Sequence, residues 1–150
     1  MKQTLFDSVG GLPTLKKVHR IFYDKVYSHP WIGRFFIGHN QDVIENRQTT
    51  FMGEKMGGPV EYHGKEMELT HEAMYITEEL FRLRQSLLEE SLIEAGVGEK
   101  LRERWLKIDG AFRKKIVKDS FSAFMKTTWP YKKHIVIPRP QGGRQNPPSD

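Results

Sequence analysis

The sequence has no cysteine among its 150 residues. Disulfide bonds, thiolate metal ligands, iron–sulfur clusters and cysteine nucleophiles are therefore excluded. Apolar residues never run long enough to predict a membrane-spanning segment, which needs about eighteen of them. The opening stretch, MKQTLFDSVGG, lacks the apolar centre of a signal peptide, so a cytoplasmic location is the default expectation.

Alternation of apolar and polar residues is also missing, and no strand is predicted. Apolar residues recur instead at helical spacing. We therefore expect an all-α fold with four main helices and a short fifth around His71. The four main helices are expected over residues 12–28, from Asn40 or Asp42 to about Met56, from Thr77 to about Ala95, and from about Glu99 to Ile116.

The ends of these helices carry recognisable signals. Asn40 or Asp42 is the expected N-cap of the second helix, and Thr77 is the expected N-cap of the third. The glycine–glycine–proline run at 57–59 breaks the second helix, because proline removes a donor and glycine adds backbone freedom.

The C-terminal part of the sequence predicts a weak helical extension followed by a tail without regular structure. Val117, Phe121 and Phe124 extend the apolar face of the last helix by a turn or two. The stretch IVIPRPQGGRQNPPSD, residues 135–150, is rich in proline and glycine and predicts an extended, mostly disordered tail. We expect a folded domain over residues 1–119 and a basic Pro/Gly-rich extension over 120–150.

Charge gives only a weak functional signal. The formal net charge is +5, and many of the basic residues lie after position 112. A basic balance permits weak attraction to nucleic acid, anionic lipid or an acidic protein. No groove-binding motif accompanies it, so we expect a solvated basic surface and no nucleic-acid partner.

His71 carries the most chemical information. Met67, His71 and Met74 share one face of a helix, downstream of the 57–59 break. A neutral imidazole on an apolar helical face is what an iron porphyrin needs as its protein ligand. A core histidine with an internal hydrogen-bond partner gives the same pattern, and both interpretations stay open on this motif alone.

Two more polar residues fall where burial is expected. Gln48 lies in the apolar stripe that includes Phe51 and Met52, and Tyr23 lies on the inner side of the first helix. A buried amide without a partner costs about 1–3 kcal/mol. Either Tyr23 and Gln48 bond each other or a buried water, or both donate to a ligand that gains negative charge on binding, such as dioxygen on ferrous haem.

In their order and spacing these residues resemble a truncated haemoglobin, of the two-over-two globin family, over about 5–118. Phe36, Gln48 and the Tyr-x-Gly-x-x-Met approach to His71 resemble the first subgroup most. The resemblance is carried by Gly10-Gly11, Phe22-Tyr23, Phe35-Phe36, Phe51-Met52, Gly57-Gly58-Pro59, the run Tyr62 to Met67 with His71 after it, and Ile76-Thr77 with Phe81.

The resemblance implies a two-over-two helical sandwich around haem b. His71 would be the proximal iron ligand, and Tyr23 and Gln48 would be the distal donors. Ile44 takes the position of the distal histidine in larger globins and cannot coordinate iron, which implies a five-coordinate ferrous state. Arg47 would pair with a haem propionate or be an ordinary exposed arginine. The implied pocket walls, each with a plain core alternative, are Phe36, Phe51, Met52, Met67, Met74, Ile76 and Phe81.

One residue departs from the family pattern. Arg84 falls on the inner side of its helix, between Phe81 and Leu88, where the first subgroup is apolar. The expectation is that it reaches a propionate or extends its charged end to solvent.

The implied activity is reversible binding of dioxygen, nitric oxide or carbon monoxide, by a monomer or weak homodimer. Nitric oxide dioxygenation to nitrate is implied as well, with a separate reductase, since the chain has no flavin or nicotinamide motif. Two alternatives remain: a gas sensor or oxygen carrier without turnover, and a haem-free basic helical module that binds nucleic acid or an acidic protein.

Overall fold

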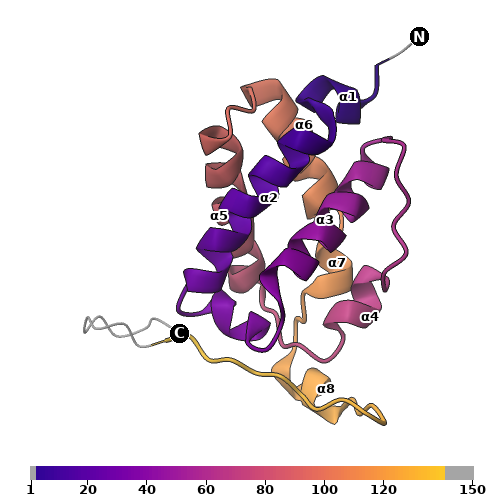
Figure 1. Ribbon diagram of the computed structural model, residues 1–150. Helices are drawn as coiled ribbons and strands as arrows, with labels where there is room; N and C mark the ends of the chain where they lie inside the picture. Colours follow the sequence, from indigo (N-terminus) through magenta and orange to yellow (C-terminus); the bar gives the residue numbers. More distant parts are fainter. Residues whose placement is uncertain (1–2, 141–150) are drawn as a thin grey trace.

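The computed structural model of this protein describes residues 3–140, and over that range helices dominate and no strand forms. The all-α expectation is confirmed. Four helices form the body: α2 (Gly11–Ser28), α3 (Gln41–Lys55), α5 (Glu78–Glu94) and α6 (Glu99–Gly110). Helix α2 packs against α3 on one side and α5 on the other, and α5 packs against α6 (Figure 1).

Short helices connect and flank this body. They are α1 (Leu5–Val9), the 3₁₀ helix η1 (Ile32–Phe36), α4 (Met67–His71), α7 (Arg113–Ile116) and α8 (Phe121–Lys126). Helices α4 and α7 lie next to each other beyond α3, and α8 lies at the lower edge of the view (Figure 1). The described helices include none with the length and apolar character needed to cross a membrane.

The main helices form where periodicity and capping agree. On α2, the side chains of Leu15, Val18 and Val26 are 0% exposed, because helical spacing puts them on one buried face. Asn40 caps α3, accepting from the backbone N–H of Val43 at 3.1 Å. The predicted caps at Asn40 and Thr77 are both confirmed.

The break after α3 depends on its glycines. Gly57 has φ +87°, a left-handed conformation that favours glycine. A Cβ atom on Gly58 would lie 2.5 Å from Cδ1 of Phe6, so a side chain there would collide with the aromatic ring. The run at 57–59 thus lets the chain turn closely past α1, which the sequence did not predict.

The prediction of one continuous helix from about Glu99 to Ile116 is wrong. Helix α6 ends at Gly110, and the short α7 ends at Ile116. Val117 is extended, and the backbone N–H of Lys118 donates to Ile76 O at 2.8 Å. The backbone therefore leaves the helix to make a tertiary contact, and α8 begins separately, capped by Ser120.

The predicted disordered tail is wrong for residues 135–140. This segment is extended, as expected, but it is bonded to the domain. The N–H of Ile135 donates to Ala73 O at 2.7 Å, and the N–H of Tyr75 donates to Ile135 O at 2.8 Å. The indole N–H of Trp31 donates to Ile137 O at 2.9 Å. Residues 141–150 lie outside the described residues.

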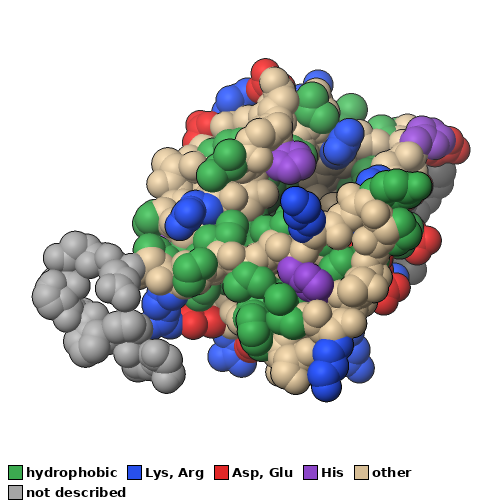
Figure 2. All heavy atoms as spheres, turned by 90° about the horizontal axis from the view of Figure 1, so that it is seen from below, with side chains coloured by type: hydrophobic (Ala, Val, Ile, Leu, Met, Phe, Trp, Pro, Cys, Tyr) green, Lys and Arg blue, Asp and Glu red, His purple; other side chains and the backbone are tan. Residues whose placement is uncertain are grey.

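Figure 2 shows the lower face, where hydrophobic side chains gather among lysines, arginines and histidines. Much of this surface comes from α8 and the segment after it. The large exposed hydrophobic residues of that region are Phe121, Met125, Tyr131, Ile135 and Val136. The C-terminal region therefore covers part of the domain and exposes apolar surface of its own.

The bond between Ile135 and Ala73 gives a test of this docking. Ile135→Pro removes the N–H that donates to Ala73 O, so the segment should dock less firmly. The hydrogen bond from the N–H of Tyr75 to the carbonyl oxygen of residue 135 should then open more often. Since one such hydrogen bond contributes about 1 kcal/mol, amide exchange at Tyr75 should quicken roughly fivefold. Ile135→Ala keeps the N–H and is the matched control. Equal exchange rates in the proline variant and the parent would show that the segment does not hold this site.

Candidate functional site

His71 ends the five-residue helix α4, and its ring is held by its own helix. Nδ1 lies 2.8 Å from the carbonyl oxygen of Met67. A carbonyl oxygen only accepts, so Nδ1 carries the proton and Nε2 keeps its lone pair. Burial lowers the pKa of His71 to about 4, with Met67 raising it and the charges of Arg84 and Lys118 lowering it further. The imidazole is therefore neutral at neutral pH.

Lys118 anchors the chain around His71. Its Nζ donates to the carbonyl oxygens of His71 and Met74, each at 2.8 Å. Burial lowers the pKa of Lys118, and Glu72 raises it. The ammonium group thus binds backbone carbonyls at the end of α4 and just beyond it. None of the residues of α4 is buried, so this contact helps to hold the helix in place.

Tyr23 lies on α2 and is 5% exposed. Its ring meets Phe22 edge-on at 4.8 Å and Phe36 at 6.0 Å between centroids. Burial raises the pKa of Tyr23 to about 12, against the lowering effect of Arg84. The phenol therefore keeps its proton and is a hydrogen-bond donor at neutral pH.

Gln48 lies half-buried on α3. No hydrogen bond joins its amide to Tyr23, although both residues are within the described range, so the direct bond considered from the sequence does not form. Arg47, its neighbour on α3, is exposed.

The predicted wall residues divide between two apolar clusters. Phe36, Ile44 and Met74 are partly buried against the main core, and Met52 is a core residue at 1% exposure. A smaller cluster contains Phe81, Ile116 and Val117, with Met67 against it. Ile76 contacts both clusters, and Phe51 packs against Phe112 at 5.1 Å between ring centroids.

Arg84 does not extend into solvent. Its Nη1 donates to both carboxylate oxygens of Asp109, at 2.8 and 2.6 Å, and its guanidinium carbon lies 5.3 Å from the centre of the Phe22 ring. Burial lowers the pKa of Arg84, but Asp109 and Tyr23 outweigh it, and the pKa is raised. The positive charge also acts on His71 and Tyr23, whose pKa values it lowers.

This donor set fits an iron porphyrin. One neutral imidazole keeps a free Nε2, and η1, α3 and α4 each supply a partly buried apolar side chain: Phe36, Ile44 and Met67. A phenol and an amide add hydrogen-bond donors without a second strong metal ligand. His71 would hold the iron, and the apolar side chains would contact the macrocycle.

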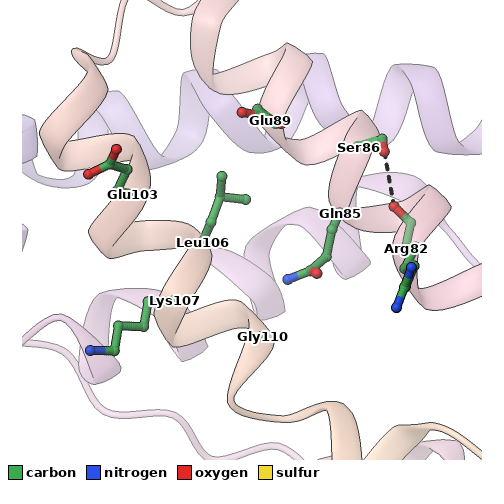
Figure 3. Close-up of a pocket in the computed structure, with 8 residues that line it drawn as sticks. All are labelled: Arg82, Gln85, Ser86, Glu89, Glu103, Leu106, Lys107 and Gly110. Atoms are coloured by element: carbon green, nitrogen blue, oxygen red, sulfur yellow. Dashed lines mark hydrogen bonds between the residues drawn. The ribbon is translucent and has the colours of Figure 1, made fainter. Parts of the chain in front are cut away.

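A separate surface hollow lies between α5 and α6 (Figure 3). Mostly polar residues line it, and no residue of the expected site is among them. Gln85 lines this hollow and donates to Asp109 at 3.3 Å, which links it to the Arg84 pair.

The model of the family described as bacterial-like globin matches residues 4–118. Group 1 truncated hemoglobin GlbN of Mycolicibacterium paratuberculosis is 32% identical over 94 residues, covering 63% of this chain and 69% of the relative. This chain belongs to the bacterial-like globins, as a group 1 truncated haemoglobin. The group 1 truncated hemoglobin of Tetrahymena pyriformis is 33% identical over 72 residues, covering 48% of this chain and 60% of that relative.

Solved structures agree with this assignment. Truncated hemoglobin from Tetrahymena pyriformis, in its Fe(III) form, has a TM-score of 0.73 and 28% identity, covering 78% of this chain and all of that one. The group II truncated hemoglobin from Bacillus anthracis, at 24% identity and a TM-score of 0.72, shows the fold alone. The expected two-over-two globin fold is confirmed, and with it a family that binds haem and oxygen.

Three polar residues of this truncated haemoglobin escaped the sequence interpretation: His19, Asp109 and Lys118. His19 is 1% exposed and its Nδ1 lies 2.7 Å from Oγ1 of Thr49. Helical spacing was the available signal, because His19 is four residues before Tyr23 and Asp109 is four residues after the buried Trp105. For Lys118 no local signal exists, since its partners are distant backbone carbonyls.

The two buried histidines predict acid sensitivity of the haem-free chain. Burial and the charge of Arg84 lower the pKa of His19 to about 3, and the pKa of His71 is about 4, whereas unfolded histidine titrates near 6.5. Between these values the unfolded chain binds more protons, so the free energy of unfolding should fall as the pH falls from about 6.5 towards 3.

Urea unfolding at a series of pH values measures this slope. The double variant His19→Leu with Thr49→Val removes the titrating ring and its partner, and should flatten the slope. Parallel curves for the variant and the parent would contradict a role for His19.

Proposed function

We propose that this globin holds haem b through Nε2 of His71 and binds dioxygen reversibly, along with nitric oxide and carbon monoxide. The observation that carries the proposal is the bond from Nδ1 of His71 to Met67 O, which leaves Nε2 with its lone pair. A bound haem iron supplies coordination of diatomic gases and one-electron chemistry. The chain's residues orient the ligand, exclude water and donate protons in hydrogen bonds.

Tyr23 and Gln48 are the proposed donors to the ligand. Tyr23 is buried and protonated, and Gln48 is half-buried with no bond to it, so both remain available. The Tetrahymena pyriformis structures include variants of one tyrosine and two glutamines. The spacing of those three residues equals the spacing of Tyr23, Ile44 and Gln48, which supports the proposal.

Apolar residues shape the rest of the proposed pocket. Ile44 has no atom that coordinates iron, so a five-coordinate ferrous state is proposed. Phe36 would stack on the porphyrin, near Tyr23. Arg47, exposed on α3, would pair with a propionate. The other proposed contacts are Phe51, Met52, Met67, Met74, Ile76 and Phe81.

Nitric oxide dioxygenation is the proposed reaction. Nitric oxide and dioxygen combine to nitrate with the uptake of one electron, which an external reductase would supply. We propose that residues 1–119 form the globin unit, with 120–150 as an extension, acting in the cytoplasm as a monomer or weak homodimer. Rapid mixing of the oxygenated protein with nitric oxide tests the reaction: fast stoichiometric nitrate is expected, and its absence would favour a sensor or carrier.

The iron ligand has its own test. His71→Gly removes the only proposed protein ligand, so the purified variant should take up little haem, measured by its visible absorption. Added imidazole should restore binding, because it replaces the missing ring. Unaltered haem uptake and colour without imidazole would exclude His71 as the ligand.

The distal donor is tested by Tyr23→Phe. Loss of one charge-assisted hydrogen bond, about 1.5–3 kcal/mol, should speed dioxygen dissociation roughly tenfold or more. Tyr27→Phe is the matched control, because the hydroxyl of Tyr27 donates to His39 O at 3.1 Å instead. Stopped-flow measurements of both variants decide the point. An unchanged rate in the Tyr23 variant would remove Tyr23 from this role.

A further inference from the structure

The surface formed by α8 and the segment after it differs in composition from the rest of the molecule. Residues 121–140 include four lysines or arginines and no aspartate or glutamate. They also supply five of the nine large hydrophobic side chains that are exposed in the described part of the chain, so exposed apolar surface is concentrated there. We define the C-terminal patch as those five residues and two of the lysines: Phe121, Met125, Lys126, Tyr131, Lys133, Ile135 and Val136.

The helical part of the patch is held in place by Phe124, the buried residue of α8. Its ring lies 5.4 Å from the ring of Tyr75 and 5.1 Å from that of His134, between centroids. Phe121 and Met125 are four residues apart on α8 and therefore lie on the same side of the helix, 48% and 40% exposed. A packed aromatic frame thus presents apolar side chains to the outside.

Tyr131 is the most exposed of the large hydrophobic side chains in the described range, at 97%. It lies in a turn between Trp129 and Lys132, which form an antiparallel backbone bridge. A tyrosine ring combines an apolar body with a polar hydroxyl, and such rings are enriched where a membrane meets water. The turn therefore projects a side chain that suits a membrane interface.

The unpaired charge of the patch comes from Lys126 and Lys133. Both are exposed, and within residues 3–140 neither has an ion-pair partner. The other two cations of the stretch pair with glutamates outside it: Lys132 with Glu72, and Arg139 with Glu79. On the lower face as a whole, acidic side chains lie towards the edges, while hydrophobic and basic ones occupy the middle (Figure 2). The patch is therefore complementary to a negatively charged partner.

A lipid surface fits these features better than a protein does. A second copy of this chain would bring two basic patches together, and like charges repel. A protein that inserts an anchor needs a groove, but the two best-formed hollows of the described residues lie elsewhere, between α5 and α6 and between α2 and α3. A bilayer needs no groove, because projecting rings enter its headgroup layer and lysines lie against anionic headgroups.

We propose that the C-terminal patch binds the surface of a bilayer that contains anionic lipids. Phe121, Met125 and Tyr131 enter the headgroup layer, and Lys126 and Lys133 lie beside lipid phosphates. The chain rests on the membrane, since no described helix is long and apolar enough to cross it. Dioxygen and nitric oxide are apolar and dissolve better in hydrocarbon than in water, so a docked globin meets its proposed ligands at a higher concentration. This gain in gas supply rests on the proposed function, whereas lipid binding does not.

Vesicle flotation of the full-length protein, as purified, tests the proposal. The vesicles contain phosphatidylcholine alone, or phosphatidylcholine and phosphatidylglycerol in equal parts. Binding is expected only to the anionic vesicles, and it should weaken as salt screens the charges. Since each lysine near an anionic surface strengthens binding roughly fivefold, Lys126→Gln with Lys133→Gln should weaken it roughly twenty-fivefold. Phe121→Ser with Tyr131→Ser removes the inserted rings and should weaken it roughly tenfold or more.

Matched controls make the same kinds of change away from the patch. Lys16→Gln with Lys100→Gln removes two exposed lysines, on α2 and α6, and should leave vesicle binding almost unaltered. Ile37→Ser with Ile93→Ser removes two apolar side chains that are 74% and 54% exposed, and should have no effect. Circular dichroism checks that every variant keeps the helical content of the parent.

Three results would overturn the proposal: no binding to the anionic vesicles at low salt, equal binding to the neutral vesicles, or equal losses in the patch and control variants. Analytical ultracentrifugation tests the other occupant. Self-association that the patch variants abolish, without vesicle binding, would assign the patch to a second copy of the chain. None of these measurements involves haem or its ligands, so the proposed function stands or fails independently of them.

Discussion

The geometry of the site depends on one hydrogen bond, from Nδ1 of His71 to the carbonyl oxygen of Met67. It selects the tautomer that leaves Nε2 free. Helix α4 is too short to hold itself in place, because five residues form few internal hydrogen bonds. Lys118 and the segment at Ile135 supply the missing contacts, through the carbonyls of His71, Ala73 and Met74. The position of His71 is thus set by residues that lie far away in the sequence.

Charge is distributed in the interior so that the candidate ligand side chains stay neutral. Burial keeps His71 unprotonated and Tyr23 protonated near neutral pH, which are the forms needed for a metal ligand and a hydrogen-bond donor. Arg84 is the charged exception, and Asp109 balances it. The positive charge of Arg84 lowers the pKa of both His71 and Tyr23, so one side chain acts electrostatically on both candidate residues.

Local signals predicted those parts of the fold that depend on local contacts. The four main helices follow from apolar spacing, and the caps at Asn40 and Thr77 follow from side-chain chemistry. The prediction failed beyond Gly110, where backbone groups bond to distant segments instead of continuing a helix. Tail residues such as Ile135 have a composition typical of disorder, yet they bond to the domain because it offers backbone partners near Ala73.

The sequence by itself determined the helical class, the family resemblance and the candidates His71, Tyr23 and Gln48, because spacing and residue type are local properties. Only the tertiary structure decided that Arg84 pairs with Asp109 over the ring of Phe22, and that Lys118 and the C-terminal segment hold the chain around His71. These contacts join residues far apart along the chain. The partner of each residue depends on how the helices pack and on which backbone groups remain without a hydrogen bond. A local sequence pattern predicts neither.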